Sequence, residues 1–250
     1  MKKHVLVAIL FIICSSLFSS YSFSQAITID TTLANQYLDL AKKNENSAKY
    51  DSAIFYAEKA RVLNIRHFGE KSIKNANDLY LLGKLCWRDD KYELALEYYF
   101  KALQIRQKIL GEKHADVAIS YHYIGVVYHY KAEYDKALEY YNKALQLRQE
   151  ILGEKHSDVA KSYNNIGVIY SMKAEYDKAL EYFLKAMQIR KEILGGKHPD
   201  VVADYNNIGL VYYHKGEYDK ALEFLFIALK INKEIYGEKH PDVATNYTNI

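Results

Sequence analysis

A phrase close to Tyr-Asp-Lys-Ala-Leu-Glu-Tyr returns every 42 residues along this chain of 250 residues. Its first tyrosine stands at Tyr50, Tyr92, Tyr134, Tyr176 and Tyr218. A glycine follows the same interval, at Gly69, Gly111, Gly153, Gly195 and Gly237. Self-similarity at such a period indicates an array of stacked repeats. Because each repeat of an array packs only on its neighbours, we expect no single central core.

One repeat contains the pattern of two helices. Between residues 117 and 130, apolar and aromatic residues fall three and four apart, which is typical of an amphipathic helix. A turn is expected at 131–133, and a second helix from 134 to about 152, ended by Gly153 in the left-handed conformation. Pro199 and Pro241 stand where first helices begin, a position that tolerates proline. The sequence therefore predicts an all-α protein of stacked antiparallel helix pairs.

The repeat resembles the tetratricopeptide repeat, in which a large residue, Leu-Gly, Tyr, Ala, an aromatic residue and Ala follow one another at set spacings. Three consecutive repeats carry this pattern, as Tyr121, Ile124-Gly125, Tyr128, Ala137, Tyr141 and Ala144; as Tyr163, Ile166-Gly167, Tyr170, Ala179, Phe183 and Ala186; and as Tyr205, Ile208-Gly209, Tyr212, Ala221 and Ala228. The 42-residue length is similar to that of kinesin light chains and of many bacterial multi-repeat proteins. The resemblance implies a right-handed superhelical solenoid whose concave groove binds protein partners.

The phase of the repeat divides the chain. We expect a signal peptide at 1–24, a short segment at 25–33, and five units at about 34–75, 76–117, 118–159, 160–201 and 202–243, with 244–250 the start of a sixth. The first unit is atypical, with Ala41 and Asn44 at the glycine and tyrosine positions, as a terminal cap should be. Since the last phase is cut in mid-helix, we expect the natural polypeptide to continue.

The N-terminus has the pattern of an export signal. Lys2 and Lys3 precede an apolar run from Val5 to Phe18, and small polar residues around Ser24 predict cleavage there. The protein is then expected on the periplasmic or extracellular side of a bacterial cell. An uncleaved anchor is the alternative, although the run is short for a membrane span. A lipid-modified Cys14 is disfavoured by the bulky Ile13 before it.

Charge and cysteine content exclude some partners and bonds. When Lys2 and Lys3 leave with the signal, the 34 basic residues fall to 32, against 31 acidic residues. Nucleic-acid binding requires clustered basic residues, so we expect no nucleic-acid partner and no membrane contact beyond the signal. The mature chain keeps only Cys86 and can form no internal disulfide.

Several repeated residues have a structural interpretation. We expect the glycines at 83, 125, 167 and 209 to let two helices approach, and most of the 25 tyrosines to be buried between neighbours. The loop histidines His114, His156, His198 and His240 recur too far apart to share a metal ion, because stacked helices lie about 8–10 Å apart. We expect them to be loop and cap residues, with no metal or cofactor bound.

The candidate ligand-binding residues lie on the first helix of each repeat, which should line the groove. Asparagine carries both donors and an acceptor, which suits it to grip a peptide backbone; the alternative is that one asparagine of each pair bonds to a neighbouring helix. The resemblance adds that kinesin light chains place asparagines here for cargo peptides. The candidates are Asn164, Asn165, Asn206, Asn207, Thr248 and Asn249, with His122, Tyr123, His129 and Tyr213 beside them.

These patterns predict a non-catalytic scaffold that binds a peptide or partner domain. No phosphate loop, nucleophile turn or metal-spaced cysteine pair is found in the sequence, so we expect no enzyme activity. The alternative is the extracytoplasmic input of a longer signalling protein, a histidine kinase or a transcription regulator. Self-association through an open C-terminal end is possible, since Phe224, Phe226 and Ile227 make the last full unit apolar outside.

Overall fold

The computed structural model describes residues 30–250. They fall into two compact units that meet between Ile109 and Leu110, called here the N-terminal unit (30–109) and the C-terminal unit (110–250). The expected signal peptide at 1–24 lies outside the described residues, as does most of the segment at 25–33. Every regular element from residue 30 onward is a helix, so the all-α prediction is confirmed.

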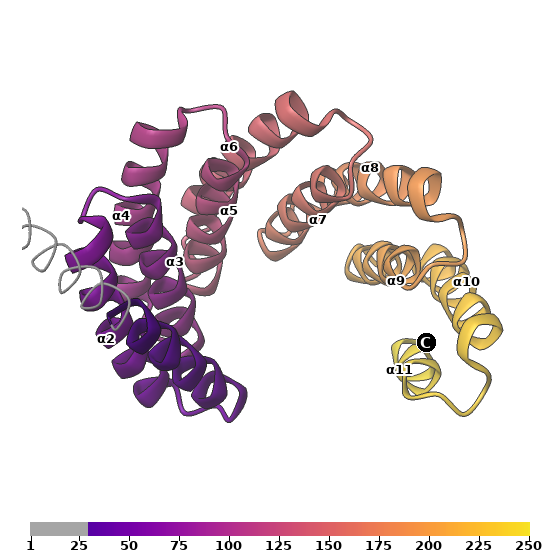
Figure 1. Ribbon diagram of the computed structural model, residues 1–250. Coiled ribbons are helices and arrows are strands. Elements are labelled where there is room, and N and C mark those ends of the chain that lie inside the picture. Colours follow the sequence, from indigo (N-terminus) through magenta and orange to yellow (C-terminus); the bar gives the residue numbers. More distant parts are fainter. Residues whose placement is uncertain (1–29) are drawn as a thin grey trace, which may run out of the picture. The chain divides into compact units, whose positions relative to one another are not determined.

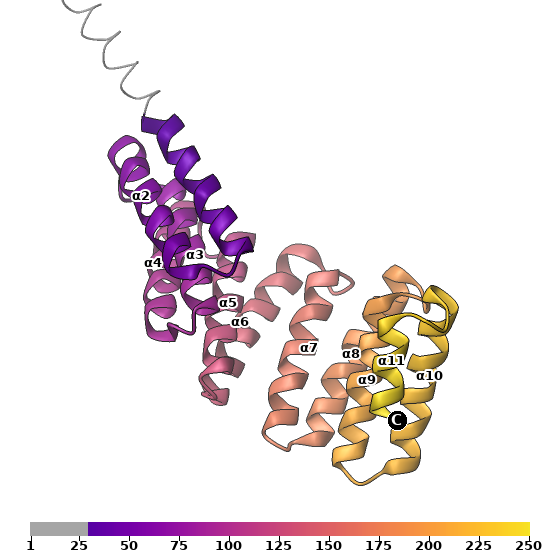
Figure 2. The same cartoon turned by 90° about the horizontal axis from the view of Figure 1, so that it is seen from below.

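Consecutive helices pair within each unit (Figure 1). The N-terminal unit holds a first helix described over 30–46, then α2 (Tyr50–Phe68), α3 (Ile73–Arg88) and α4 (Tyr92–Leu110). The C-terminal unit holds α5 (Ala115–Tyr130), α6 (Tyr134–Leu152), α7 (Ser157–Met172), α8 (Tyr176–Leu194), α9 (Pro199–His214), α10 (Tyr218–Tyr236) and α11 (Pro241–Asn249). Helices of 16 and 19 residues alternate from α3 to α10, and α9, α10 and α11 lie side by side in both views (Figures 1 and 2).

Glycines in the first helices let the two helices of a repeat pack closely. A Cβ built on Gly125 would lie 2.7 Å from the Tyr141 ring, and one on Gly167 would lie 2.9 Å from the Phe183 ring. Real side chains do not approach this closely, so the aromatic ring fills the volume that a methyl group would need. Both rings belong to buried clusters at the interfaces of neighbouring helices, as the sequence predicted.

Loop histidines begin the first helices. The Nδ1 atom of His156 accepts a hydrogen bond from the backbone N–H of Asp158 at 3.1 Å, which satisfies one free donor of α7. His114, His198 and His240 cap α5, α9 and α11 in the same way. The expectation of a capping role is confirmed, and the imidazole ring here performs what serine or aspartate usually performs.

The turn between the two helices of a repeat has the same strained backbone in successive repeats. Ala132 and Ala174 adopt positive φ angles of 57° between the two helices of their repeats, where Gly216 has 78°. The loop glycine Gly153 has the expected positive φ of 81°, but its ψ of 164° places it outside the left-handed helical region. That combination is open essentially only to glycine. The expected left-handed cap is therefore corrected to an extended glycine turn.

Phe224 corrects another expectation. Its ring packs against Tyr205 and Tyr212 at centroid distances of 6.0 and 5.5 Å and is not part of an apolar outer surface. The equivalent rings of Tyr140 and Tyr182 pack in the same way in the preceding repeats. Phe226, by contrast, is 53% exposed, as expected.

Candidate functional site

The first helices line the inner side of the C-terminal unit. In Figure 1, α5, α7, α9 and α11 face inward, while α6, α8 and α10 lie behind them. The pairs Asn164-Asn165 and Asn206-Asn207 are half-buried and hold equivalent positions on α7 and α9. Near the C-terminal ends of α5, α7 and α9, Tyr130, Met172 and Tyr213 are 57%, 58% and 55% exposed. These first helices therefore carry half-buried amides and, nearer their C-terminal ends, large exposed side chains.

Two hydrogen bonds connect asparagines across neighbouring repeats. The Nδ2 of Asn207 on α9 donates to Oδ1 of Asn164 on α7 at 3.0 Å. The Nδ2 of Asn246 on α11 donates to Oδ1 of Asn206 on α9 at 2.9 Å. The structural alternative for the asparagines thus holds for Asn164, Asn206 and Asn207. Each bond fixes which way an amide is turned, because oxygen and nitrogen cannot exchange places without breaking it.

The other polar candidates are engaged less. The side chains of Asn165 and Asn249 make no hydrogen bond within residues 30–250, and both are half-buried. Thr248 is exposed, and its Oγ1 donates to the carbonyl of Thr245 at 2.7 Å, a bond within its own helix. Asn165 and Asn249 are therefore the candidates whose side chains make no hydrogen bond in the described part of the chain.

His122 and Tyr123 stand one repeat earlier, on α5. The His122 ring lies 5.1 Å from that of Tyr123 and 5.7 Å from that of Tyr141 on α6. Burial, followed by the nearby Arg148, lowers the His122 pKa to about 3, so the imidazole is neutral at physiological pH. Its Nδ1 is buried without a hydrogen-bond partner in the described region. The His122 ring thus packs against the second helix of its repeat, which makes it a poor candidate for a ligand contact.

His129 and Tyr213 lie near the ends of their helices. The His129 ring lies 5.4 Å from Tyr130 and 6.5 Å from Tyr134, and burial lowers its pKa. Tyr213 contacts the rings of His214 and Tyr218 at 5.5 and 5.7 Å while remaining largely exposed. The structure pairs Asn207 with Asn164 and Asn246 with Asn206 in two separate hydrogen bonds. His129 and Tyr213 lie nearer the C-terminal ends of their helices.

The matched sequence profile decides the family. The profile of the Tetratricopeptide repeat matches residues 75–150, 124–192, 158–225 and 205–250. The chain belongs to this family. Solved structures agree in fold: BtubC (BKLC) from P. vanneervenii has a TM-score of 0.74 at 24% identity, covering 91% of each chain. A putative kinesin light chain repeat protein from Podosopora anserina has a TM-score of 0.72 at 17% identity, covering 82% of this chain and 97% of that one.

Other tetratricopeptide repeat structures are also similar. Aspartyl phosphate phosphatase F from Bacillus subtilis has a TM-score of 0.77 at 17% identity, and the match covers 94% of this chain but 59% of that one. MamA has a TM-score of 0.55 at 23% identity, over 82% of this chain and 95% of that chain. No curated protein matches the sequence. At these identities the solved structures establish the fold, and the tetratricopeptide repeat itself is generally a non-catalytic scaffold for protein partners.

A buried polar row was missed in the sequence. Arg148 donates to Ser162 Oγ at 2.6 Å, Arg190 to Asp204, and Asn232 to Asn246 at 2.6 Å, each between a second helix and the next first helix. The signal was present, because a polar residue recurs every 42 positions within the apolar stripe of the second helix. Through Asn246 this row joins the inner-face asparagines.

Asp204 is the most perturbed acid of this row. The residue is fully buried, and only one of its two carboxylate oxygens has a hydrogen-bond partner. Burial raises the Asp204 pKa to about 7, although the Arg190 guanidinium favours the charged form. The interface between the α7–α8 and α9–α10 pairs therefore contains a group that titrates near neutral pH.

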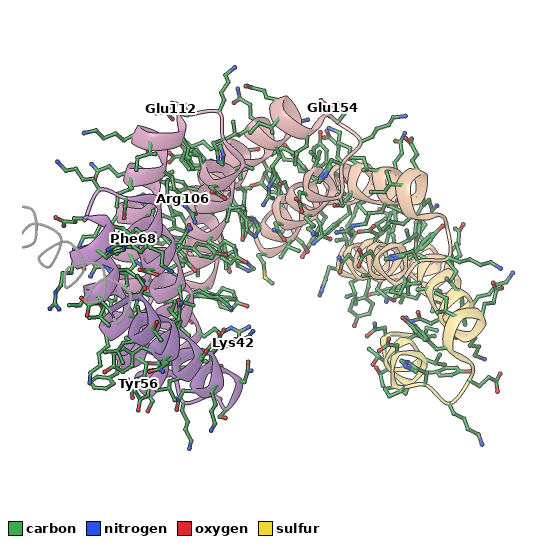
Figure 3. The ribbon with its side chains drawn as sticks, in the orientation of Figure 1. Lys42, Tyr56, Phe68, Arg106, Glu112 and Glu154 are labelled. Carbon is green, nitrogen blue, oxygen red and sulfur yellow. The ribbon has the colours of Figure 1, made fainter. Side chains whose placement is uncertain are left out.

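Metal binding and membrane insertion were also considered for the described residues. Among residues 30–250, no three His, Cys, Asp or Glu side chains gather closely enough to hold a metal ion. No helix in the same range has the length and apolar character needed to cross a bilayer. Figure 3 shows Glu154, which accepts a hydrogen bond from Gln149 at 2.8 Å, on the loop that joins α6 to α7. The Glu154 carboxylate is therefore held by a side chain of the preceding helix α6.

Proposed function

We propose that the chain is a non-catalytic interaction scaffold that binds an extended peptide along the inner face of its C-terminal unit. The asparagines would hold the peptide backbone, and the exposed Tyr130, Met172 and Tyr213 would contact its side chains. Large aromatic and sulfur-containing side chains of this kind dominate the binding energy of many interfaces. Loss of water from them on binding would supply most of the affinity.

The observation that carries the proposal is the orientation of the bonded amides. Since Asn164 and Asn206 each accept with Oδ1, each keeps its two N–H groups for a peptide carbonyl. Asn207 donates with Nδ2, so its Oδ1 remains to accept from a peptide N–H. An extended backbone presents both kinds of group, and amides fixed in advance lose less conformational entropy on binding.

Asn165 supports the same proposal because its side chain has no hydrogen-bond partner among residues 30–250. Its polar side chain is half-buried on α7 without a hydrogen bond in the described chain, although asparagine is a poor helix former. A bound peptide would supply the missing partner. On α9, Leu210 lies one helical turn after Asn206 and is 38% exposed. It would cover an apolar side chain of the same peptide.

A peptide array probed with the mature chain and its variants tests this function. Asn165→Ala should weaken the selected peptides about tenfold, because one or two hydrogen bonds are lost. A triple variant with Asn164→Ala, Asn206→Ala and Asn207→Ala should abolish selection. Asn142→Ala is the matched control, since its Nδ2 bonds only to the Leu138 carbonyl of its own helix α6. Equal recovery by wild type and Asn165→Ala, with unchanged circular dichroism, would refute backbone binding by this face.

We further propose that the protein acts after export, as the basic residues and apolar run at its N-terminus suggest. Mass determination of the N-terminus of protein made in a bacterial host tests this. A mature chain beginning shortly after Ser24 would support export, and a chain beginning at Met1 in the cytoplasm would refute it. The sensor alternative requires the same export and an additional signalling domain, and it remains a prediction.

A further inference from the structure

Three repeats of the C-terminal unit contain the same ion pair. A lysine on the loop before the first helix contacts a glutamate near the end of the second helix, with the nitrogen and oxygen 2.9 Å apart in each case. The pairs are Lys113–Glu150, Lys155–Glu192 and Lys197–Glu234. Their recurrence at the 42-residue interval shows that this place in the repeat accommodates a carboxylate.

A glutamine holds the same carboxylate in two of these repeats. Gln146 Nε2 donates to Glu150 Oε1 at 3.1 Å, and Gln188 Nε2 donates to Glu192 Oε1 at 3.3 Å. A lysine and a glutamine thus converge on one carboxylate. Both groups have counterparts one repeat earlier, in the N-terminal unit, as Lys71 and Gln104.

The N-terminal unit lacks the carboxylate itself. The residue equivalent to Glu150 is Lys108, so two lysines and a glutamine stand where the other repeats have a completed ion pair. Neither Lys71 nor Lys108 has a carboxylate partner among residues 30–250. A cavity of about 290 Å³ lies at this place, lined by Lys71, Gln104, Ile105, Lys108 and Ile109.

The cavity continues into a second one of about 300 Å³. Lys71, Gln104 and Ile105 line both, and the second extends toward Arg61 and Leu79. Two of the other cations there are paired, since Arg61 contacts Glu58 at 3.2 Å and Lys101 contacts Glu97 at 2.5 Å. Glu70 also lines this second cavity and has no ion-pair partner among residues 30–250. The unpaired charges of the two linings are therefore the cations Lys71 and Lys108 and the anion Glu70, which leaves a net positive charge at this place.

We propose that this place in the N-terminal unit, between the loop after α2 and the helix α4, binds a carboxylate side chain from an acidic segment of a partner protein. The carboxylate would sit between Lys71, Lys108 and Gln104, as Glu150 sits between Lys113 and Gln146. Apolar side chains next to the acid would cover Ile105 and Ile109, of which Ile109 is 46% exposed. In Figure 3, Phe68 marks the end of α2, and Arg106 marks the C-terminal part of α4.

Shape and charge favour a peptide over a small free acid. Two adjoining cavities offer more volume than one carboxylate fills, and the apolar part of the lining requires apolar groups from the ligand. The site lies wholly within the N-terminal unit. It therefore stands independently of the peptide proposed for the C-terminal unit.

The test titrates the full chain with acetyl-Leu-Glu-Leu-amide at low salt and follows the Lys71, Gln104 and Lys108 signals by NMR. Lys108→Glu restores the ion pair of the other repeats, so it should weaken the peptide at least about tenfold while the fold is retained. Lys42→Glu is the matched control. It makes the same change of charge at an exposed residue of the first helix that lines neither cavity, and it should alter affinity less than about twofold.

Further ligands and variants decide the alternatives. Acetyl-Leu-Gln-Leu-amide and butyrate should both bind at least about tenfold more weakly than the glutamate peptide. Equal binding of butyrate would overturn the peptide as the ligand, and equal binding of inorganic phosphate would overturn selectivity for a carboxylate. Unchanged binding by Lys108→Glu, or an equal loss with Lys42→Glu, would overturn the site itself. In the opposite direction, Glu150→Lys should create a second peptide site beside Lys113, which wild type lacks.

Discussion

The Nδ2 of Asn207 on α9 donates a hydrogen bond to Oδ1 of Asn164 on α7, 43 residues earlier in the chain, at 3.0 Å. Asn207 is not the residue one repeat after Asn164, because that position is Asn206. The bond therefore runs obliquely from the first asparagine of one repeat to the second asparagine of the next. It makes these residues both a link between repeats and a fixed set of free donors and acceptors.

We expect Asn164→Ala and Asn207→Ala each to lower the free energy of unfolding by about 1 kcal/mol, because each leaves a partly buried amide without its partner. The double variant should lose less than the sum of the two single variants. Urea unfolding of the four proteins gives this comparison. Asn165→Ala serves as control and should change stability by less than about 0.5 kcal/mol.

The Asp204 carboxyl predicts a dependence of stability on pH. Burial raises its pKa to about 7 in the folded chain, from the ordinary aspartate value of 3.8. Between about pH 4 and 7 the folded state therefore binds more protons than the unfolded state. The stabilisation that the protonated Asp204 carboxyl provides is fully present below pH 4 and is lost as the pH rises through 7. The free energy of unfolding falls by at most about 1.4 kcal/mol per pH unit.

Asp204→Ser removes the titrating group and copies the Arg148–Ser162 pair of the preceding repeat. Urea unfolding of both proteins between pH 4 and 8 checks the prediction. The stability of wild type relative to Asp204→Ser should fall over this range. A difference that stays constant with pH would show that Asp204 is ionised throughout.

The histidine caps predict that removing an imidazole side chain lowers the stability of the fold. His156→Ala should destabilise the chain by about 1 kcal/mol, since the Asp158 N–H at the start of α7 loses its acceptor. His156→Asn should recover most of that loss, because asparagine is a preferred N-cap. Thermal unfolding measures both, and equal melting temperatures for the alanine and asparagine variants would argue against capping.

Equivalent turns with alanine and glycine allow a reciprocal exchange. Ala174 has a φ of 57°, and Gly216 has 78° at the same place one repeat later. Gly216→Ala should cost about 1 kcal/mol, because a Cβ is strained in this region. Ala174→Gly should be neutral or stabilising by up to about 1 kcal/mol, since relief of strain opposes the greater entropy of unfolded glycine. Chemical denaturation of both variants provides the comparison.

The fold could be predicted because its determinants lie close together in the sequence. Gly125 and Tyr141, which pack together, lie on consecutive helices joined by one short loop. The bounds of α6 follow from the loop before Tyr134 and the glycine after Leu152. Pro199 marks the first residue of α9 in the same direct way. Local signals of this kind fix helices and their pairing without knowledge of distant contacts.

The details of the candidate site depend on partners far away in the chain. Asn246 contacts Asn206 across 40 residues, and which atoms meet depends on the rotation of α11 against α9. Phe224 was misassigned because the periodicity alone does not distinguish the outer surface from the seam between helices. The exchange of glutamate for lysine at Lys108 was visible in the repeat, but its meaning required the Lys113–Glu150 contact.

The most direct test of peptide binding by the inner face follows the side-chain amide signals of the asparagines by ¹⁵N NMR, with a peptide selected on the array. We predict that the NH₂ signals of Asn164, Asn165 and Asn206 shift on binding, while that of Asn142 on α6 does not. Shifts confined to other surfaces, with these three signals unchanged at saturation, would contradict the account.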